Sequence, residues 1–383
     1  GVFLSGGIDS SSLVALISQQ HKIKIKTFSI GFGVPKFDEL KFARTVAKKF
    51  NTDHHELIVT PKSLDILAPL IWFLDEPFAD TSIIPTYLLS KSSRDFITVA
   101  LSGEGGDELF AGYPWTLRFH MIKYYNLLPN ALRKIAFRTL IRDPLAVYNS
   151  RGYLNKLGRF LLDASVSMED GFFRRTTINS PPPDLLYADS IKDNLKVFNA
   201  KEIQRRLFNQ APVLDKPEKM LYVDTKMYLP EDCLFKVDRM SMANSQEVRP
   251  VLLDHKLVEF AATIPFQLKL QGLTTKYILK KTVSSMLPKE ILRQRKQGFG
   301  MPISFWLKKE LGGLTKKILL DERTLKRGFF NPDTLKRILS GQEKGTKDYA
   351  GTIWAIFIFE LWARIFLDLP SGDYKNISLS DLT

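Results

Sequence analysis

Two short segments of the chain combine glycines with hydroxyl or carboxylate side chains, a composition typical of sites that bind charged ligands. The first, residues 5–11, reads S-G-G-I-D-S-S and directly follows the apolar residues 2–4. Gly6 and Gly7 let the backbone approach an anion closely and adopt a positive φ. The helix predicted to begin near Asp9 has first N–H groups without partners of their own. A phosphate placed there would meet free donors, the positive end of the helix dipole and serine hydroxyls.

The spacing within this loop separates two classes of nucleotide site. It lacks the G-x-x-x-x-G-K-[ST] pattern of the Walker P-loop. It is instead similar to the S-G-G-x-D-S pyrophosphate loop of ATP pyrophosphatases, which split ATP between the α and β phosphates. An ordinary strand–turn–helix connection, in which Asp9 only caps the helix, is the alternative. Two glycines and three hydroxyls in one short run favour the nucleotide interpretation.

The second segment, residues 101–113, reads L-S-G-E-G-G-D-E-L-F-A-G-Y and follows a predicted buried strand. Its acids Glu104, Asp107 and Glu108 could bind Mg²⁺, which prefers carboxylate and phosphate oxygens, or an amino group. Acids at the start of a helix, where the dipole favours them, are the alternative. That alternative accounts for two of the three acids but not for the glycines around them or for the following Gly-Tyr.

The elements that must position these loops alternate between strand and helix. Strands are predicted over residues 25–32, 53–59 and 97–101 in addition to the first, and helices over residues 12–20, 38–50, 61–74 and 81–94. The alternation predicts an α/β fold with a doubly wound parallel sheet, in which ligands bind at the carboxyl ends of the strands. Both glycine loops follow such ends.

The rest of the chain is predicted to be mostly helical, including residues 218–287. We expect one synthetase-type domain over residues 1–370, with a nucleotide-binding α/β core at 1–125 and a large, mainly helical part at 126–370 that completes the site. A flexible polar tail is expected over residues 371–383. Because the chain begins with glycine and only three apolar residues precede the first loop, we expect a truncated first strand and a fragment of a longer protein.

The composition narrows the class of protein. The 383 residues are 44% hydrophobic and 25% charged, as in ordinary globular domains, and no apolar run is expected to reach membrane-spanning length. The single cysteine, Cys233, excludes an internal disulfide framework and favours a cytoplasmic setting. The net charge of +14 would suit nucleic acid. Its positive residues are spread out and not interleaved with aromatic side chains, so nucleic acid is not the expected partner.

Together the two loops resemble the synthetase domain of glutamine-dependent asparagine synthetases. The resemblance covers Gly1 to about Leu367 and includes D-E-P-F-A-D at 75–80, K-V-D-R-M-S-M-A at 236–243, E-V-R at 247–249 and R-K-Q-G-F-G-M-P at 295–302. The second loop is its most specific part, because the first would also fit GMP synthetase, NAD synthetase or tRNA-lysidine synthetase.

The resemblance implies an ATP-dependent amide ligase. In that family the side-chain carboxylate of L-aspartate attacks the α-phosphate of Mg-ATP, which gives β-aspartyl-AMP and pyrophosphate. Ammonia then attacks the activated carbonyl and gives L-asparagine and AMP. Such chemistry relies on fixed donors and cations that neutralise the charge developing on the phosphates. ATP and Mg²⁺ are therefore the expected cofactors.

The resemblance also assigns residues to roles. The positions that match the family's nucleotide contacts are Ser5, Gly6, Gly7, Asp9, Ser10, Ile30, Ser102 and Gly103. Within the same motifs, Asp9 and Asp107 are the expected metal ligands.

The expected catalytic residues are Glu104, Asp107, Arg239 and Lys296, by the same match to family motifs. Glu104 would lie close to the acyl-adenylate and assist the ammonia step, and Asp107 would hold metal or substrate. Tyr113 would line the substrate site together with these two acids. Arg239 and Lys296 would face the pyrophosphate, although a lone base is more often a surface residue.

Several features stay open at this point. The family's N-terminal glutaminase domain, with its nucleophilic cysteine, is not part of this sequence, so free ammonia is the expected nitrogen source for this chain. The acceptor could instead be a sugar uronic acid or another cell-envelope or natural-product carboxylate. A tRNA-modifying enzyme of the same superfamily is a further alternative, which the second loop and the lack of paired cysteines disfavour. No membrane partner is expected, and the oligomeric state is open, a homodimer included.

Overall fold

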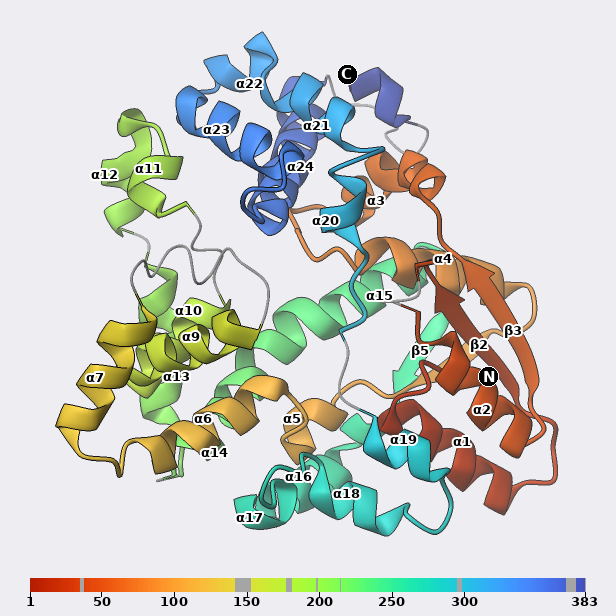
Figure 1. The fold of residues 1–383 in the computed structure, drawn as a ribbon. Helices are drawn as coiled ribbons and strands as arrows, with labels where there is room; N and C mark the ends of the chain where they lie inside the picture. Colours follow the sequence, from red (N-terminus) through yellow and green to blue (C-terminus); the bar gives the residue numbers. More distant parts are fainter. Residues whose placement is uncertain are drawn as a thin grey trace. The chain divides into compact units, whose positions relative to one another are not determined.

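The computed structural model describes residues 1–34, 38–141, 153–176, 181–197, 199–213, 215–294, 298–369 and 377–382. Contacts divide the chain into two units. The sheet unit comprises Gly1–Leu74, Asp80–Leu117 and Leu221–Pro302, and the helical unit comprises Asp75–Ala79, Arg118–Met220 and Ile303–Thr383. The chain therefore leaves the sheet unit after residue 117 and returns to it at residue 221, a path that Figure 1 follows by colour. The boundary expected at residue 125 stays a prediction.

The sheet unit is built on five parallel strands in the order β3-β2-β1-β4-β5. Their bounds are β1 Val2–Phe3, β2 Lys26–Gly31, β3 Asp53–Ile58, β4 Val99–Ser102 and β5 Glu247–Pro250. The short β1 is central, and its Val2 lies opposite Thr27 of β2 and Leu101 of β4. Because the strand order runs outward from β1 in both directions, the sheet is doubly wound, with its switch point between β1 and β4. The predicted α/β fold is confirmed.

Strand β5 corrects the expectation that residues 218–287 are helical throughout. Val99 of β4 pairs with Glu247, and Ser102 pairs with Pro250 at the other end of β5. The four residues of β5 alternate between exposed and half-buried, and two of them are charged. Such a short edge strand carries no apolar run, so sequence periodicity gives no signal for it. Its terminal proline is tolerated because the strand lies at the edge of the sheet.

Helices cover both faces of the sheet (Figure 1). The bounds in the sheet unit are α1 Ile8–Gln20, α2 Leu40–Lys49, α3 Leu67–Leu74, α4 Ile83–Arg94, α5 Gly106–Phe110, α15 Phe235–Met242, α16 His255–Thr263, α17 Phe266–Lys269, α18 Tyr277–Thr282 and α19 Lys289–Arg293. Helices α1 and α2 pack with Val2 and Leu4 of the central strand region in one buried cluster. Helices α4 and α15 pack against each other and cover the other face.

The remaining helical segments of this unit are two irregular ones and the parts of two helices that it shares with the helical unit. The helix expected over residues 61–74 begins as a 3₁₀ segment, Pro61–Ile66, before α3. Helices α6 (Pro114–Tyr125) and α14 (Lys216–Val223) contain the residues at which the chain passes between the units. A π-helical segment, Asp224–Leu234, connects α14 to α15. Such a segment often marks a functional region of a helix.

The helical unit contains the remaining helices. Their bounds are α7 Asn130–Leu140, α9 Tyr153–Ala164, α10 Met168–Thr176, α11 Pro183–Leu186, α12 Asp189–Val197, α13 Ala200–Gln210, α20 Ile303–Trp306, α21 Gly312–Leu319, α22 Glu322–Lys326, α23 Pro332–Glu343 and α24 Ala350–Ala363. Helix α24 packs against α20, α21 and α23. Within the expected tail, Leu379–Leu382 forms a 3₁₀ turn in which Leu379 and Leu382 are buried.

One helical segment among the described residues, Ala350–Asp368, has the length and hydropathy that a membrane span requires. The expectation that no apolar run reaches that length is therefore wrong. Of the most apolar window of this segment, 67% is buried within the structure, and the core helix of a globular protein meets the same criteria.

Candidate functional site

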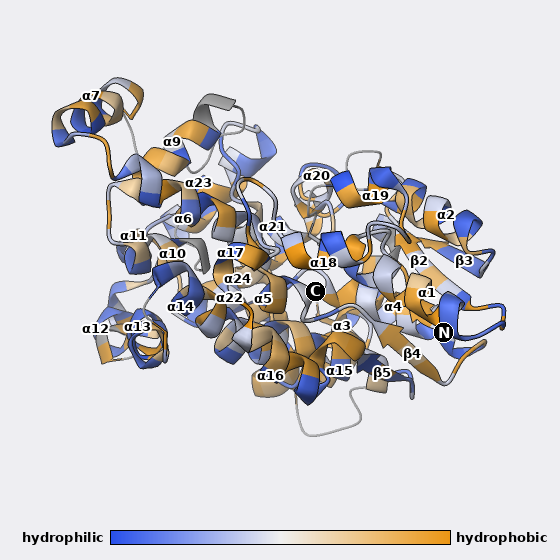
Figure 2. Cartoon of the chain, turned by 90° about the horizontal axis from the view of Figure 1, so that it is seen from below, coloured by the Kyte–Doolittle hydropathy of each residue, from blue (hydrophilic) through white to orange (hydrophobic). Residues whose placement is uncertain are grey.

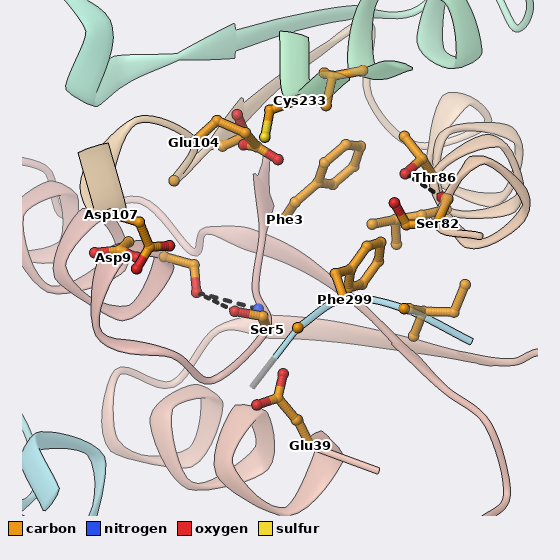
Figure 3. Close-up of a pocket in the computed structure, with 18 of the residues that line it drawn as sticks. Phe3, Ser5, Asp9, Glu39, Ser82, Thr86, Glu104, Asp107, Cys233 and Phe299 are labelled. Atoms are coloured by element: carbon orange, nitrogen blue, oxygen red, sulfur yellow. Dashed lines mark hydrogen bonds between the residues drawn. The ribbon is translucent and has the colours of Figure 1, made fainter. Parts of the chain in front are cut away.

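A pocket of about 440 Å³ opens at the carboxyl ends of the strands, and every described residue that lines it belongs to the sheet unit. Ser5 lines it directly after β1, Ile30 lines it from β2, and Ser102 and Gly103 line it at the end of β4. This is the switch point of the sheet, where ligands bind in doubly wound folds. The volume is in the range of small-molecule sites. Figure 3 shows the side chains that point into it.

Hydrogen bonds made by its own serine side chains stabilise the conformation of the first glycine loop. Ser5 Oγ lies 3.1 Å from Ser10 Oγ and accepts a hydrogen bond of 3.2 Å from the N–H of Gly7. Gly6 has φ +80°, and a Cβ there would lie 2.6 Å from the backbone nitrogen of Ala43, so only glycine fits. The loop therefore brings together the predicted residues 5–10.

The helix that follows the loop starts without a side-chain cap. Gly7 is the N-cap of α1, and no side chain accepts a hydrogen bond from the first turn. Asp9 lies inside that turn, so the alternative in which Asp9 only caps the helix is wrong. The N-terminus of α1 therefore has no capping side chain among the described residues, an arrangement that favours an anion there.

The two glycine loops are in contact. A Cβ on Gly103 would lie 2.9 Å from Asp9 Cβ and 3.0 Å from the backbone nitrogen of Ser10. Gly103 is therefore needed for close approach rather than for an unusual φ. The hydroxyl of Ser102, on a residue only 2% exposed, has no hydrogen-bond partner among the described residues. The contact places both loops on one wall of the pocket.

Lys276 joins the two loops electrostatically. Its Nζ lies 2.5 Å from Asp9 Oδ2 and 2.8 Å from Asp107 Oδ1, and its side chain is 4% exposed. It immediately precedes α18 in a left-handed conformation (φ +52°), which its N–H bond to the carbonyl of Phe110 helps to fix. Figure 3 shows the two carboxylates side by side.

Sequence reasoning missed Lys276. It lies far along the chain from both aspartates, and its neighbours, T-T-K-Y, form no nucleotide-binding motif. The only signal was indirect: two acids expected to be close together inside a protein need a cation. The sequence offered many lysines as candidates for that cation.

The aspartate pair fits Mg²⁺ only in company with a ligand. No group of three or more His, Cys, Asp or Glu side chains that could hold a metal occurs within the described ranges. Mg²⁺ is commonly bound by one or two carboxylates together with substrate phosphates. Asp9 and Asp107 both line the pocket and supply such a pair.

The other acids of the second loop lie in different environments. Glu104 lines the pocket, and Figure 3 shows it beside Cys233. Glu108 is 3% exposed and accepts a 2.6 Å hydrogen bond from Tyr113 Oη. Burial, with a smaller contribution from the charge of Asp107, raises the pKa of Glu108 to about 7, although the bond from Tyr113 opposes this. Glu108 is therefore partly protonated near neutral pH.

Aromatic side chains form part of the pocket wall next to these acids. The rings of Tyr113 and Trp115 stack with centroids 3.9 Å apart, and Tyr228 meets Tyr113 edge-on. Trp115 Nε1 donates a 3.0 Å hydrogen bond to Asp224 Oδ2. The predicted residue Tyr113 thus lines the pocket with two aromatic partners that sequence reasoning did not single out.

A second buried ion pair lines the pocket. Lys236 Nζ lies 2.5 Å from Asp80 Oδ2. Burial alone would raise the pKa of Asp80, but Lys236 and the hydrogen bonds from Ser82 hold it below its usual value. Burial and the charge of Asp80 raise the pKa of Asp232 to about 7. The site therefore holds one firmly ionised carboxylate and one easily protonated carboxyl close together.

Cys233 lines the pocket as well, but its environment does not activate it. Burial, with further contributions from nearby carboxylates, raises the pKa of this thiol to about 12. The thiolate is the nucleophilic form. Cys233 is therefore a protonated thiol at neutral pH.

Two predicted basic residues are not in the described pocket wall. Arg239 is exposed on α15, and its guanidinium carbon lies 5.2 Å from the ring centroid of Phe235. Lys296 falls outside the described residues, although residues 298–300 line the pocket. The roles assigned to both residues stay predictions.

Comparison with known proteins agrees with the geometry. The family described as Asparagine synthase matches residues 1–364. Asparagine synthetase (glutamine-hydrolyzing) 1 of Bacillus subtilis (strain 168) is 30% identical over 373 residues, which are 96% of this chain and 56% of that protein. A putative asparagine synthetase (glutamine-hydrolyzing) of Mycobacterium bovis is 28% identical over 375 residues, 96% of this chain and 55% of that protein.

An archaeal relative matches a shorter part of the chain. The putative asparagine synthetase (glutamine-hydrolyzing) 2 of Methanocaldococcus jannaschii is 32% identical over 249 residues, 63% of this chain and 45% of that protein. The chain thus spans about half the length of the curated relatives that it matches. The family match covers nearly the whole chain, and the two glycine loops meet at the switch point of the sheet. The chain therefore belongs to the asparagine synthase family.

Proposed function

We propose that this chain is an ATP-dependent carbon–nitrogen ligase that converts L-aspartate into L-asparagine. An oxygen of the side-chain carboxylate attacks the α-phosphorus of ATP, and the bond from that phosphorus to the bridging oxygen of the β-phosphate breaks. The products of this step are β-aspartyl-AMP and pyrophosphate. Ammonia then attacks the acyl carbon, the carbon–oxygen bond to AMP breaks, and one proton is released.

The observation that carries the proposal is the convergence of the two glycine loops on one pocket, with Asp9 and Asp107 drawn together by Lys276. The uncapped N-terminus of α1 and the hydroxyls of Ser5 and Ser10 would bind the pyrophosphate part. Mg²⁺, held by the two aspartates and the phosphates, would neutralise phosphate charge. Lys276 would keep the two carboxylates at the spacing this requires.

Other lining residues receive the remaining roles. The backbone near Ile30 would contact adenine, and the Ser102 hydroxyl would donate to the nucleotide. Glu104 would accept the proton that ammonia releases on attack. Arg239 and Lys296 would face the pyrophosphate as it leaves.

The nitrogen source is also part of the proposal. The names of the relatives describe them as glutamine-hydrolyzing, and this chain spans about half their length. We propose that a glutaminase domain outside this sequence supplies ammonia to Glu104 and its surroundings. Without such a domain, residues 1–383 would use ammonium salts directly.

The test is pyrophosphate release by the full chain with Mg-ATP and ammonium, with and without L-aspartate. Aspartate-dependent release of pyrophosphate, matched by an equal amount of asparagine, is the expected result. Binding of ATP without any aspartate-dependent turnover would reject aspartate as the acceptor while leaving the adenylation site in place. Failure to bind ATP at all would reject the proposal.

A second acceptor class is favoured by the stacked Tyr113 and Trp115 and by the edge-on Tyr228 in the pocket wall. Aromatic walls offer apolar contact area to ring-bearing ligands as well as polar groups at their edges. The same chemistry on a sugar uronic acid would use that wall. Pyrophosphate release with a panel of uronic acids and nucleotide-linked uronic acids, but not with aspartate, would support this acceptor class instead.

A further inference from the structure

The corner between α6 and α7 in the helical unit exposes large apolar side chains. The exposed fractions are 79% for Leu127, 61% for Ile135, 58% for Tyr124 and 55% for Leu132. Leu132 and Ile135 are three residues apart and share one face of α7. Helix α7 has no buried residue at all. Single exposed leucines are ordinary, but a contiguous group marks an interaction site.

The opposite side of α7 is the one that anchors it. Phe137 packs on the cluster of Ile141, Leu161 and Leu162, which also includes residues of α9. Arg133 donates hydrogen bonds to the side chains of Asn126 and Asn130, and these bonds tie the end of α6 to the start of α7. The exposed face is therefore held outward by packing on the inner side.

Positive charge lies close to these apolar residues: on α7, Arg138 follows Ile135 by three positions and shares its face, whereas Lys134 precedes Phe137 by three positions and lies toward the anchored side. Lys134 and Arg138 are exposed on α7, four residues apart, and the Lys123 side chain is 58% exposed on α6. The stretch from Pro114 to Ile141 contains no Asp or Glu. Lys123 lies 3.8 Å from Asp215, whereas Lys134 and Arg138 form no ion pair among the described residues. Figure 2 shows hydrophobic and hydrophilic bands side by side along α7.

We propose that this basic apolar patch (Tyr124, Leu127, Leu132, Ile135, Lys123, Lys134 and Arg138) binds an anionic lipid surface. A helix that combines exposed leucine and isoleucine with Lys and Arg lies in the plane of a membrane interface, with its apolar face among the acyl chains. The long basic side chains reach back to the headgroups, whose negative charge complements them. This inference does not depend on the proposed ligase activity.

The composition of the patch favours lipid over nucleic acid. Single-stranded nucleic acids bind to platforms on which bases stack on aromatic rings. The patch has one aromatic residue, Tyr124, and its most exposed side chains are aliphatic. Aliphatic groups gain most by leaving water for a hydrocarbon phase.

The test is co-sedimentation of the full chain with two kinds of vesicle, phosphatidylcholine alone and phosphatidylcholine with an equal part of phosphatidylglycerol. We expect binding to the anionic vesicles, weak binding to the neutral ones, and weakening with added salt. The double variant Leu132→Gln/Ile135→Gln should weaken binding to anionic vesicles about tenfold or more. The variant Lys134→Gln/Arg138→Gln should weaken it severalfold and reduce its salt dependence.

Matched controls use exposed residues outside the patch. Ile203→Gln on α13, at 55% exposure, matches Leu132, and Lys316→Gln on α21 matches the lysines of the patch. Neither should change vesicle binding, and circular dichroism checks that all variants are folded. Absence of vesicle binding, or binding that both patch variants leave unchanged, would overturn the proposal. So would a patch that proves instead to bind RNA, or a self-association that the Leu132/Ile135 variant abolishes without any vesicle binding.

Discussion

Each unit of the molecule contains a cluster of opposite charges around a buried cation. The two clusters differ in whether their carboxylates line a cavity. In the sheet unit, Lys276 holds Asp9 and Asp107, both of which line the pocket. In the helical unit, Arg364 and Glu360 are each 1% exposed, and Arg364 also contacts Asp321, whose side chain is 34% exposed, but none of the three lines that pocket. Buried charge by itself therefore does not identify a site; access of the partner carboxylates to a cavity does.

The helical cluster is satisfied internally. Arg364 Nε donates to Glu360 Oε1 at 2.9 Å, Nη1 donates to the carbonyl of Leu382 at 2.6 Å, and Nη2 donates to Asp321 Oδ2 at 2.7 Å. Arg327 Nε donates to the other oxygen of Glu360 at 2.9 Å. None of these residues lines the pocket of the sheet unit. A fully bonded guanidinium of this kind is structural.

Glu108 and Asp232 of the sheet unit have raised pKa values, whereas Asp321 of the helical unit, like Asp80 beside Lys236 in the sheet unit, has a lowered one. In the sheet unit, burial raises the pKa of Glu108 to about 7, and burial with the charge of Asp80 raises that of Asp232 to about 7. In the helical unit, burial acts against Asp321, but the hydrogen bond from Arg364 and other contacts bring its pKa below the usual value. Raised carboxyl pKa values close to a pocket are typical of functional sites.

The largest expected effect is that of Lys276→Met. Removing the cation takes away the charge that lies between Asp9 and Asp107, so Mg-ATP would no longer meet the same carboxylate pair. Loss of one preorganised electrostatic group lowers turnover by about 100- to 1,000-fold, and we expect the upper end because one lysine serves two ligands. Steady-state pyrophosphate release by the folded variant measures this. The control is Lys281→Met, an exposed lysine on the helix that Lys276 precedes; an equal loss there, or activity of Lys276→Met near that of the parent, would contradict the assignment.

The matched substitution in the other cluster is Arg364→Met. It leaves Glu360 buried with one cationic partner fewer, which we expect to lower the free energy of unfolding by about 3–5 kcal/mol. Urea unfolding measures the loss. Pyrophosphate release per folded molecule should stay close to that of the parent chain. A fully folded Arg364→Met variant without activity would contradict the conclusion that this cluster is structural and the Lys276 cluster functional.

The opposite pKa shifts predict opposite pH dependences. Glu108 has a folded pKa of about 7 and an ordinary value of 4.5, so the folded state binds the proton between these values. Its contribution to stability is present below pH 4.5 and is lost as the pH rises toward 7, a change of about 3 kcal/mol. Glu108→Gln should therefore flatten the fall in the free energy of unfolding between these pH values.

Asp321→Asn is the counterpart of this experiment in the helical unit. The lowered pKa of Asp321 gives a contribution that is present above its ordinary value of 3.8 and is lost as the pH falls below that value. The Asn variant should differ from the parent at neutral pH and converge with it in acid. Matching profiles for the Glu108 and Asp321 variants would show that the two regions do not differ in the sign of their titration.

Among the effects on activity, a smaller one than that of Lys276→Met is expected for Glu104→Gln. If Glu104 accepts a proton in the ammonia step, its loss should slow asparagine formation by about 100-fold. Exchange of labelled pyrophosphate into ATP, which reports adenylation alone, should fall much less. An equal fall in both measurements would move Glu104 from the ammonia step to nucleotide binding.

The predictable parts of the fold are those that depend on residues close together in the sequence. Both glycine loops were found because glycine, hydroxyl and carboxylate residues occur together within a few positions. Strands β2, β3 and β4 were found because they carry apolar runs or alternation. Strand β5 has neither, and its place beside β4 is set only by tertiary pairing.

The site residues also divide into those that belong to local motifs and those that tertiary structure brings to the site. Asp9 and Asp107 belong to local motifs, and both line the pocket. Lys276, which contacts both aspartates, and Lys236, which lines the pocket, come from distant parts of the chain, so their places at the site follow only from the folded structure. Arg239 lies within one turn of Lys236 on α15 yet is exposed, because the packing of that helix decides which base faces inward.

The pairing of β4 with β5 has a consequence for synthesis on the ribosome. The outer edge of β4 is complete by residue 102, but its partner at Glu247 follows only after the excursion through the helical unit. At about 5–20 residues per second, that edge would stay without its neighbour for on the order of ten seconds. Lys276 emerges later still, so Asp9 and Asp107 are made long before their shared counterion. We therefore expect the sheet unit to finish folding only after its last segment, Leu221–Pro302, has been made, and to depend on chaperones that shield open strand edges until then.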